Sequence, residues 1–342
     1  MTTETLYLRC HFFVVGTRPL CLWDTSISDK NLKFLNSIDP SYFEYLGQLY
    51  SDSLNTQDQS TSRKAQHAAL ALRTAYAQAL ETLFALICSA IQAPWCVPAW
   101  VNAYKNHELR DLVEKIQETQ QIISLLETET PSWSTVYDFL FPALDIEDEI
   151  YKSAVRDGFI RTWKRFAYDF LDDGSIREYN SIKHGLRISS GGFKLHIGIP
   201  EEPGVPPPTD KMVEVTSSDF GSSYLNFEKV GDQAHHLCLK GELRNWNLES
   251  LVWGLQLAAM SIANVQSVLK GQSENNSQAP FRCPGDLLDF DRWRGFVTLT
   301  EPEIAIPSEL IHPFTKEDIL SNYKAGIYSQ SRNILLREGN NG

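Results

Sequence analysis

The stretch EDEIYKSAVRDGFIRTWKRFAYDFL, residues 147–171, decides the fold class. Its large apolar side chains recur every three or four residues, the spacing that places them on one face of a helix. These side chains are Tyr151, Val155, Phe159, Trp163, Phe166 and Phe170. Acidic residues crowd the beginning of the stretch, and Lys164 and Arg165 lie nearer its end, which matches the helix dipole. The pattern predicts a long helix that buries an aromatic face.

Helical patterns extend on both sides of this stretch. Further helices are predicted over residues 41–53, 62–92, 99–127, from 132 to a pause at Pro142, and 247–270. Between residue 192 and the helix at 247–270 the pattern changes to short alternating segments. These predict strands at residues 193–200, 212–218, 224–230 and 235–243. Residues 6–15 form another β-like segment.

The expected fold is therefore mainly α: a helical bundle with a small antiparallel β insertion, α+β overall. Four parts are expected along the chain. They are an N-terminal β-like segment with a short helix at 1–60, a helical core at 61–190, the β insertion at 191–245, and a C-terminal helix returning to the core with a mixed tail at 246–342.

The composition describes a folded, acidic protein. Hydrophobic residues make up 42% of the 342 residues, enough for a sizeable core, which excludes wholesale disorder. There are 31 basic and 43 acidic residues, so the formal net charge is -12. A surface of this sign repels phosphate backbones at long range and disfavours a general nucleic-acid coat protein. Any contact with nucleic acid is expected at a local basic patch.

The cysteines and the N-terminus indicate the cytoplasm. The six cysteines form no C-x-x-C pair, so reduced thiols are expected. The N-terminus lacks the basic start and long apolar centre of a signal peptide. Residues 82–104 carry no charge and are long enough to cross a bilayer. Because Gln92, Pro94 and Pro98 interrupt them, we expect the buried end of a core helix followed by a bend, and no membrane association.

The chain contains none of the common phosphate-binding, zinc-protease or hydrolase motifs. His235, His236 and Cys238 are close in sequence, and His196 or Cys283 could join them, but their spacing matches no structural zinc pattern. We expect an ordinary half-buried strand there, with no metal and no cofactor.

The segment SIREYNSIKHGLR, residues 175–187, is the most informative for function. As a helix opened by Ser175, it would pack through one apolar face and present a cationic face on roughly the opposite side. The apolar face consists of Tyr179, Ile182 and Leu186, and the cationic face consists of Arg177, Asn180, His184 and Arg187. The simplest interpretation is a solvated face, with His184 hydrogen-bonded near a helix end.

The same face has a chemical use. Cleavage of an RNA phosphodiester without a metal needs a base, an acid and a cation for the charged phosphorane. Histidine can carry the proton, and the arginine fork can bind the non-bridging oxygens. In this hypothesis His184 is the acid or base, Arg177 stabilises the phosphorane and Asn180 orients the reacting groups. Lys183 and Arg187 hold substrate phosphates.

Arg177, six intervening residues and then His184 resemble the signature of the HEPN superfamily. The polar residue that usually follows the arginine is here Glu178, and the asparagine comes at position 180. The resemblance implies an α-helical fold and a metal-independent endoribonuclease of prokaryotic antiviral defence or toxin systems. It also implies RNA as substrate, a homodimer with facing Arg/His pairs, and an antitoxin or defence-system protein as partner.

A second hypothesis assigns no catalysis. The chain would be a helical scaffold or sensor that binds a protein partner through its β insertion. The acidic net charge favours a protein partner over bulk nucleic acid.

Overall fold

The structure is a computed structural model in which two compact units are distinguished. It describes residues 10–24, 26–54, 63–142, 144, 146–200, 207–229, 237–271, 279–290, 303–311, 317 and 320–321. Unit 1 consists of Met1–Ser223 and Leu243–Glu303, and unit 2 of Tyr224–Glu242 and Ile304–Gly342. The predicted functional residues all belong to unit 1.

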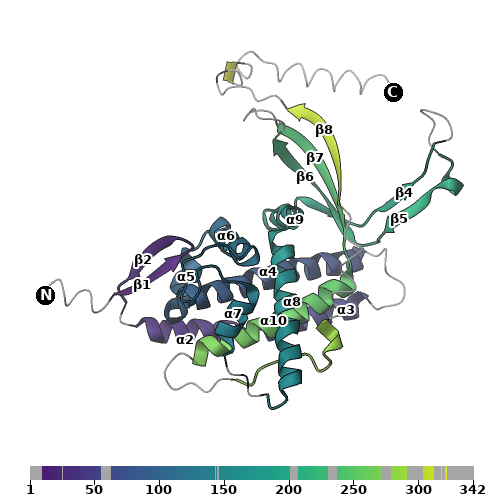
Figure 1. Cartoon of the computed structure of the whole chain (residues 1–342). Helices are drawn as coiled ribbons and strands as arrows, with labels where there is room; N and C mark the ends of the chain where they lie inside the picture. The colour runs from purple at the N-terminus through teal and green to yellow at the C-terminus, as the bar shows by residue number, and fades with distance from the viewer. Residues whose placement is uncertain are drawn as a thin grey trace. The chain divides into compact units, whose positions relative to one another are not determined.

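Unit 1 is a helical body, which confirms the mainly α prediction (Figure 1). Its helices are α2 (Ile27–Ser37), α3 (Ser41–Leu54), α4 (Arg63–Gln92), α5 (Val97–Ala103), α6 (Asn106–Gln117), α7 (Trp133–Leu140), α8 (Glu149–Leu171), α9 (Asp173–Lys183) and α10 (Leu248–Gly271). The long helices α4 and α10 pack against each other, and α3 packs against both. The helix α2 was not predicted.

The helix α8 forms as its pattern predicts. The side chain of Asp148 caps its beginning by accepting the backbone N–H groups of Ile150 and Tyr151. The middle of its aromatic face is buried, and Tyr151 and Phe170 are partly buried. The fully buried Trp163 donates its indole N–H to the Ser261 hydroxyl of α10 at 3.1 Å. Burying a side chain of this size contributes roughly 3 kcal/mol of stability. The contact therefore fixes α8 against α10.

Two described helices, α4 and α10, are long and apolar enough to cross a membrane by length and composition. Their most apolar stretches are 72% and 67% buried inside the protein, as in helices that form a core. At the end of α4, the Gln92 carboxamide accepts the backbone N–H of Gly16 and the indole N–H of Trp100. A short turn at Pro94–Cys96 follows, which confirms the predicted buried helix end and bend.

The helix predicted over residues 99–127 is wrong in its second half. Two shorter helices, α5 and α6, occupy this region, and α6 ends at Gln117. Beyond it, the backbone N–H of Ile122 donates to Glu129, and that of Leu125 donates to Ile91. The side chain of Ile122 is buried. Backbone pairing and burial of this irregular segment outweigh its local preference for helix.

The N-terminal hairpin joins β1 (His11–Val15) to β2 (Arg18–Leu22) in antiparallel register. This confirms part of the predicted 6–15 strand, whose first residues, 6–9, lie outside the described chain. The pairing brings Cys10 and Cys21 to a Cα separation of 6.2 Å, and they form a disulfide. The prediction of reduced thiols is therefore wrong for this pair. Cys88, Cys96 and Cys283 are free thiols.

The predicted β insertion is present as short antiparallel strands. The strands β4 (Lys194–Ile197) and β5 (Val213–Ser217) form a two-stranded ribbon. A second sheet has the order β3-β6-β7-β8, from β3 (Ile188–Ser190), β6 (Gly221–Lys229), β7 (Leu237–Asn245) and β8 (Glu303–Ile311). Unit 2 contains β8 from Ile304 onward and the distal parts of β6 and β7. The strand β8 lies in the tail that was predicted only as mixed.

Close backbone approach explains two glycines at the base of these strands. A Cβ on Gly192 would lie 2.2 Å from the Ser218 carbonyl oxygen, and a Cβ on Gly221 would lie 2.2 Å from the Arg244 carbonyl oxygen. Both separations are far below van der Waals contact, so any larger residue would push the chain segments apart. The first residues of β6 and the end of β7 are thus held close to each other within unit 1.

Candidate functional site

The helix α9 carries the predicted functional residues and differs from expectation at both ends. Its N-cap is Asp172, whose carboxylate accepts the Ser175 backbone N–H at 2.8 Å, so the prediction that Ser175 caps the helix is wrong. The helix ends at Lys183, and the backbone N–H groups of His184 and Leu186 donate back to the carbonyls of Asn180 and Ile182. Gly185 and Leu186 then have positive φ angles of 107° and 52°. The chain therefore turns away from the helix axis after His184.

Arg177, Asn180 and His184, here called the α9 row, follow one another at three- and four-residue steps and so share one side of α9. Arg177 and Asn180 are half-buried, and His184 is exposed. Arg187 is exposed but lies beyond the helix, so its predicted place in the row is wrong. Leu186 is 64% exposed and does not extend the apolar face. The turn at Gly185 is the physical reason for both differences.

Lys183 and Tyr179 lie beside the row at the end of α9. Lys183 is exposed, and its ammonium lies 5.7 Å from the centroid of the Tyr179 ring. Tyr179 is half-buried, and burial raises the pKa of its hydroxyl to about 12, with Glu81 nearby adding to the effect. The tyrosine is therefore neutral near neutral pH, whereas Lys183 adds a positive charge next to His184.

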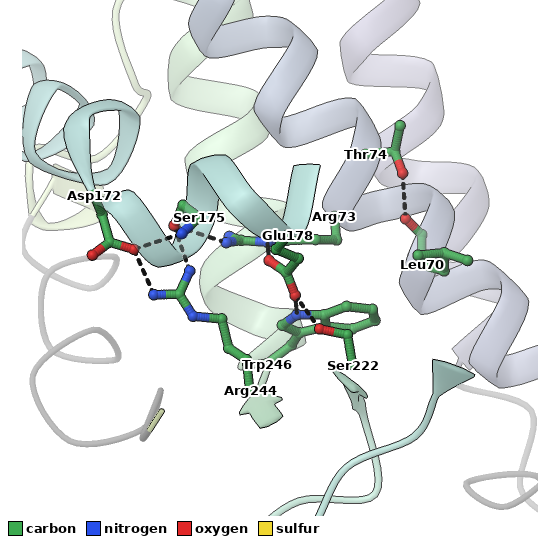
Figure 2. A network of polar contacts seen from close by, with 9 residues as sticks. All are labelled: Leu70, Arg73, Thr74, Asp172, Ser175, Glu178, Ser222, Arg244 and Trp246. Carbon is green, nitrogen blue, oxygen red and sulfur yellow. Dashed lines mark hydrogen bonds and ion pairs between the residues drawn. The ribbon is translucent and has the colours of Figure 1, made fainter. Parts of the chain in front are cut away.

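Glu178 lies at the centre of a buried polar network that the sequence analysis did not predict. It is 1% exposed, and its carboxylate Oε2 lies 2.8 Å from Nε of Arg73 on α4. The other oxygen, Oε1, accepts the indole N–H of Trp246 at 2.7 Å and the hydroxyl of Ser222 (Figure 2). Burial alone would raise the pKa of Glu178, but Arg73, Arg244 and these hydrogen bonds hold it below its ordinary value.

A second set of contacts extends this network along the start of α9. Arg244, at the end of β7, lies 2.5 Å from the Asp172 carboxylate and donates to the Ser175 hydroxyl at 2.5 Å. Arg73 donates to the same hydroxyl at 3.1 Å. Burial raises the pKa of Asp172, but the charge of Arg244 and the hydrogen bonds outweigh it and lower the pKa below its ordinary value.

These seven residues are here called the Glu178 cluster: Arg73, Asp172, Ser175, Glu178, Ser222, Arg244 and Trp246. They tie α9 to α4, to the start of β6 and to the end of β7 within unit 1. The helix that bears the α9 row is therefore held in place by buried charge pairs. One sequence signal pointed here, because Glu178 falls beside Ile182 on the apolar side of the helix, where a carboxylate requires a buried partner.

The exposed side of α8 adds positive charge next to α9 in the chain. Arg156 is engaged by Asp138 at 2.6 Å and by Asp157, so it balances local acids. Arg165 instead lies over the exposed ring of Tyr168, 5.1 Å from its centroid, although it also pairs with Asp169. Lys164 is exposed on the same side. The exposed side of α8 therefore combines ion-paired arginines with the exposed side chains of Lys164 and Tyr168.

The described residues contain no group of three or more His, Cys, Asp or Glu side chains that could hold a metal ion. His196 lies 3.5 Å from the Glu214 carboxylate across the β4–β5 ribbon. His235, His236 and the Cys238 side chain lie outside the described part of the chain.

Comparisons with known proteins do not extend this description. No protein-family model, curated protein or solved structure matches the chain. The candidate site therefore stands on its own geometry: an exposed imidazole at the end of a fixed helix, with a guanidinium and a carboxamide on the same side.

Proposed function

We propose that this chain is a metal-independent endoribonuclease of the HEPN type, acting through the α9 row. The observation that supports this best is the common side of α9 shared by Arg177, Asn180 and His184, on a helix fixed by the Glu178 cluster. Catalytic groups are effective when they are held in one geometry before the substrate arrives. The exposed His184 can be reached by a polymer without any opening of the helical body.

The reaction follows from the residue types. A base removes the proton of the RNA 2′-hydroxyl, the 2′-oxygen forms a bond to phosphorus, and the bond to the 5′-oxygen breaks as an acid protonates that oxygen. His184 supplies one of these proton transfers. Arg177 binds the non-bridging oxygens of the phosphorane, Asn180 orients the groups, and Lys183 and Arg187 bind flanking phosphates.

His184 carries one of the two proton transfers and solvent water carries the other. The facing Arg/His pairs that the HEPN resemblance implies make a second copy of the chain part of the proposal. In a homodimer with two facing rows, His184 of each copy would complete the site formed by Arg177 of the other. The exposed position of His184 at the end of α9 is compatible with such a facing arrangement.

The biological role that fits this chemistry is a toxin or antiviral defence effector that cleaves RNA in the cytoplasm. An uncontrolled ribonuclease harms its own cell, so an antitoxin or other defence-system protein would restrain it. The Cys10–Cys21 disulfide is a feature more typical of oxidising compartments. Trapping the thiols of the cytoplasmic protein with a mass-tagged alkylating reagent measures whether this bond forms there.

The reaction class is tested with wild-type protein on transfer RNA in excess EDTA. The proposal expects cleavage without added metal, with 2′,3′-cyclic phosphate and 5′-hydroxyl ends. A substrate with 2′-deoxyribose throughout serves as control and should remain intact, because it lacks the attacking hydroxyl. A strict requirement for a divalent metal, or products with 5′-phosphate ends, would contradict the proposal.

A second candidate function is supported by the β4–β5 ribbon. Four aliphatic side chains on this ribbon or just beyond the end of β4 are more than half exposed: Ile197 56%, Ile199 87%, Val213 69% and Val215 57%. Exposed aliphatic clusters are typical of protein-binding surfaces, so a scaffold or sensor would use this ribbon. A photo-crosslinking amino acid at Ile199, compared with one at the exposed Tyr45 of α3, tests this role. A specific protein adduct at Ile199, without any RNA cleavage, would favour the scaffold.

A further inference from the structure

A narrow cavity of about 50 Å³ is lined by residues of α4, α6, α8 and α9, among them Asn180 of the α9 row. Its apolar wall includes Leu80, Leu109 and Phe170, and its polar wall includes Arg110, Tyr179 and Asn180. A cavity of about 150 Å³ accommodates benzene. The present cavity therefore has room for a small polar group but not for an aromatic ring.

The carboxylates that line this cavity already have protein donors. Glu178 is occupied by Arg73 and the rest of its cluster. Asp169 accepts the Tyr76 hydroxyl at 2.7 Å and pairs with Arg165 at 3.0 Å. Glu81 accepts the Tyr104 hydroxyl at 3.4 Å. The acceptors on the cavity wall are thus engaged within the protein.

Two hydrogen-bond donors that line the same cavity, Arg110 and Asn180, differ from these carboxylates. Arg110 is half-buried, and its guanidinium lies over the Phe170 ring, 5.7 Å from the centroid. Within the described chain it has no hydrogen-bond acceptor and no carboxylate within ion-pair distance; Glu81 and Asp173 act on it only at longer range. The side-chain amide of Asn180 also makes no hydrogen bond to the described residues. A guanidinium has five N–H donors, and those of Arg110 are available to an added acceptor.

We propose that this cavity binds a small oxyanion, with the fork of Arg110 as the principal donor and Asn180 as a second. The site suits an acceptor, because Arg110 and Asn180 line the cavity and make no side-chain hydrogen bond to the described residues. A phosphate or a carboxylate presents two oxygens that match the guanidinium fork. The apolar wall strengthens the ion pair by lowering the local dielectric. This inference does not depend on ribonuclease activity.

Binding is measured by titrating inorganic phosphate into the full chain, with chloride adjusted to keep the ionic strength constant. Isothermal calorimetry gives the affinity, and the ¹⁵N-edited spectrum of the arginine Nε–H groups reports the site. We expect saturable binding and a shift of the Arg110 resonance. A parallel titration with acetate distinguishes a phosphate site from a general oxyanion site. Binding of both anions indicates general oxyanion recognition, and binding of phosphate alone indicates a phosphate site.

The variant Arg110→Leu should lose affinity at least about tenfold, because it removes the charged donors. Lys115→Met, farther along the same helix and paired with Asp111, is the matched control and should bind as the wild type does. Should Arg110→Leu fail to fold, Arg110→Lys and Asn180→Leu test the same donors singly, and each should weaken binding. Wild-type protein that binds neither anion, or an Arg110→Leu protein that binds with unchanged affinity, would overturn the proposal.

Discussion

The guanidinium Nε of Arg73 lies 2.8 Å from the Oε2 carboxylate oxygen of Glu178, and both side chains are almost fully buried. The pair joins the middle of α4 to the middle of α9, 105 residues apart in sequence. Glu178 directly follows Arg177, so its anchoring determines which way the adjacent catalytic candidates are presented. The position of the α9 row therefore depends on a buried ion pair that takes no part in the proposed chemistry.

Replacing one partner of this pair should strongly destabilise the fold. Glu178→Ala leaves the Arg73 guanidinium buried without its counter-ion, which costs about 3–5 kcal/mol. The free energy of unfolding in urea measures this loss. The surface ion pair of Arg156 with Asp138 provides the control, since Arg156→Ala should cost no more than about 1 kcal/mol. Equal losses in the two variants would contradict the structural role of Glu178.

Stability should fall in acid because of the same carboxylate. The pKa of Glu178 is lowered from its ordinary 4.5 in the folded chain, so the unfolded chain binds protons there more readily. The contribution of Glu178 is fully present above pH 4.5 and is lost as the pH falls through its folded pKa. Asp172, also lowered, adds to this loss.

Burial raises the pKa of Asp169, and this shift acts in the opposite sense. We therefore expect the free energy of unfolding, measured between about pH 7 and about pH 3, to fall with decreasing pH below 4.5, the ordinary pKa of glutamate. This fall should be shallower in Glu178→Gln than in wild type. An unchanged slope in that variant would contradict the assignment.

Gly221→Ala should separate the strands that position Ser222 and Arg244. The new Cβ would meet the Arg244 carbonyl oxygen at 2.2 Å, and relieving this clash costs about 1–3 kcal/mol. Gly285→Ala is the control, because a Cβ there has nothing within 4 Å and should change stability by no more than about 0.5 kcal/mol. Thermal unfolding of the two variants compares them. Equal melting temperatures would argue against close packing at the base of β6.

The composite site predicts complementation between two inactive variants. If each site combines Arg177 of one copy with His184 of the other, a heterodimer of Arg177→Ala and His184→Ala contains one intact site. After the two proteins are denatured and refolded together at equal concentration, about a quarter of the wild-type cleavage rate should return, since half the dimers are mixed. Absence of any recovery, although mixed dimers are detected by native mass spectrometry, would contradict a shared site.

Local patterns were sufficient to predict those helices and strands whose apolar residues recur at a regular spacing. The aromatic spacing from Val155 to Phe166 predicted α8, and the alternation after Gly192 predicted the β4–β5 ribbon. The segment following Gln117 was predicted as helix because its long-range backbone partners, such as the Ile91 carbonyl, cannot be read from nearby residues.

The candidate site shows the same division. The common side of Arg177, Asn180 and His184 followed from helical spacing, but the end of α9 at Lys183 depended on the positive φ angles of Gly185 and Leu186. The Glu178 cluster gathers residues from separate parts of the chain. The place of Glu178 beside Ile182 indicates a buried partner, but a single sequence does not show which residues are that partner. The Cys10–Cys21 disulfide was missed because the spacing of the cysteines gave no indication of a tight hairpin.

The most direct test of the central claim is the initial rate of RNA cleavage in EDTA by His184→Ala compared with His107→Ala. Both histidines are exposed in unit 1, and His107 lies on α6, outside the α9 row. Circular dichroism and urea unfolding establish that the two variants are folded equally well. The account predicts that His184→Ala loses cleavage at least about a hundredfold, as expected for removal of a general acid or base, while His107→Ala retains the wild-type rate. Equal rates in the two variants would contradict a catalytic α9 row.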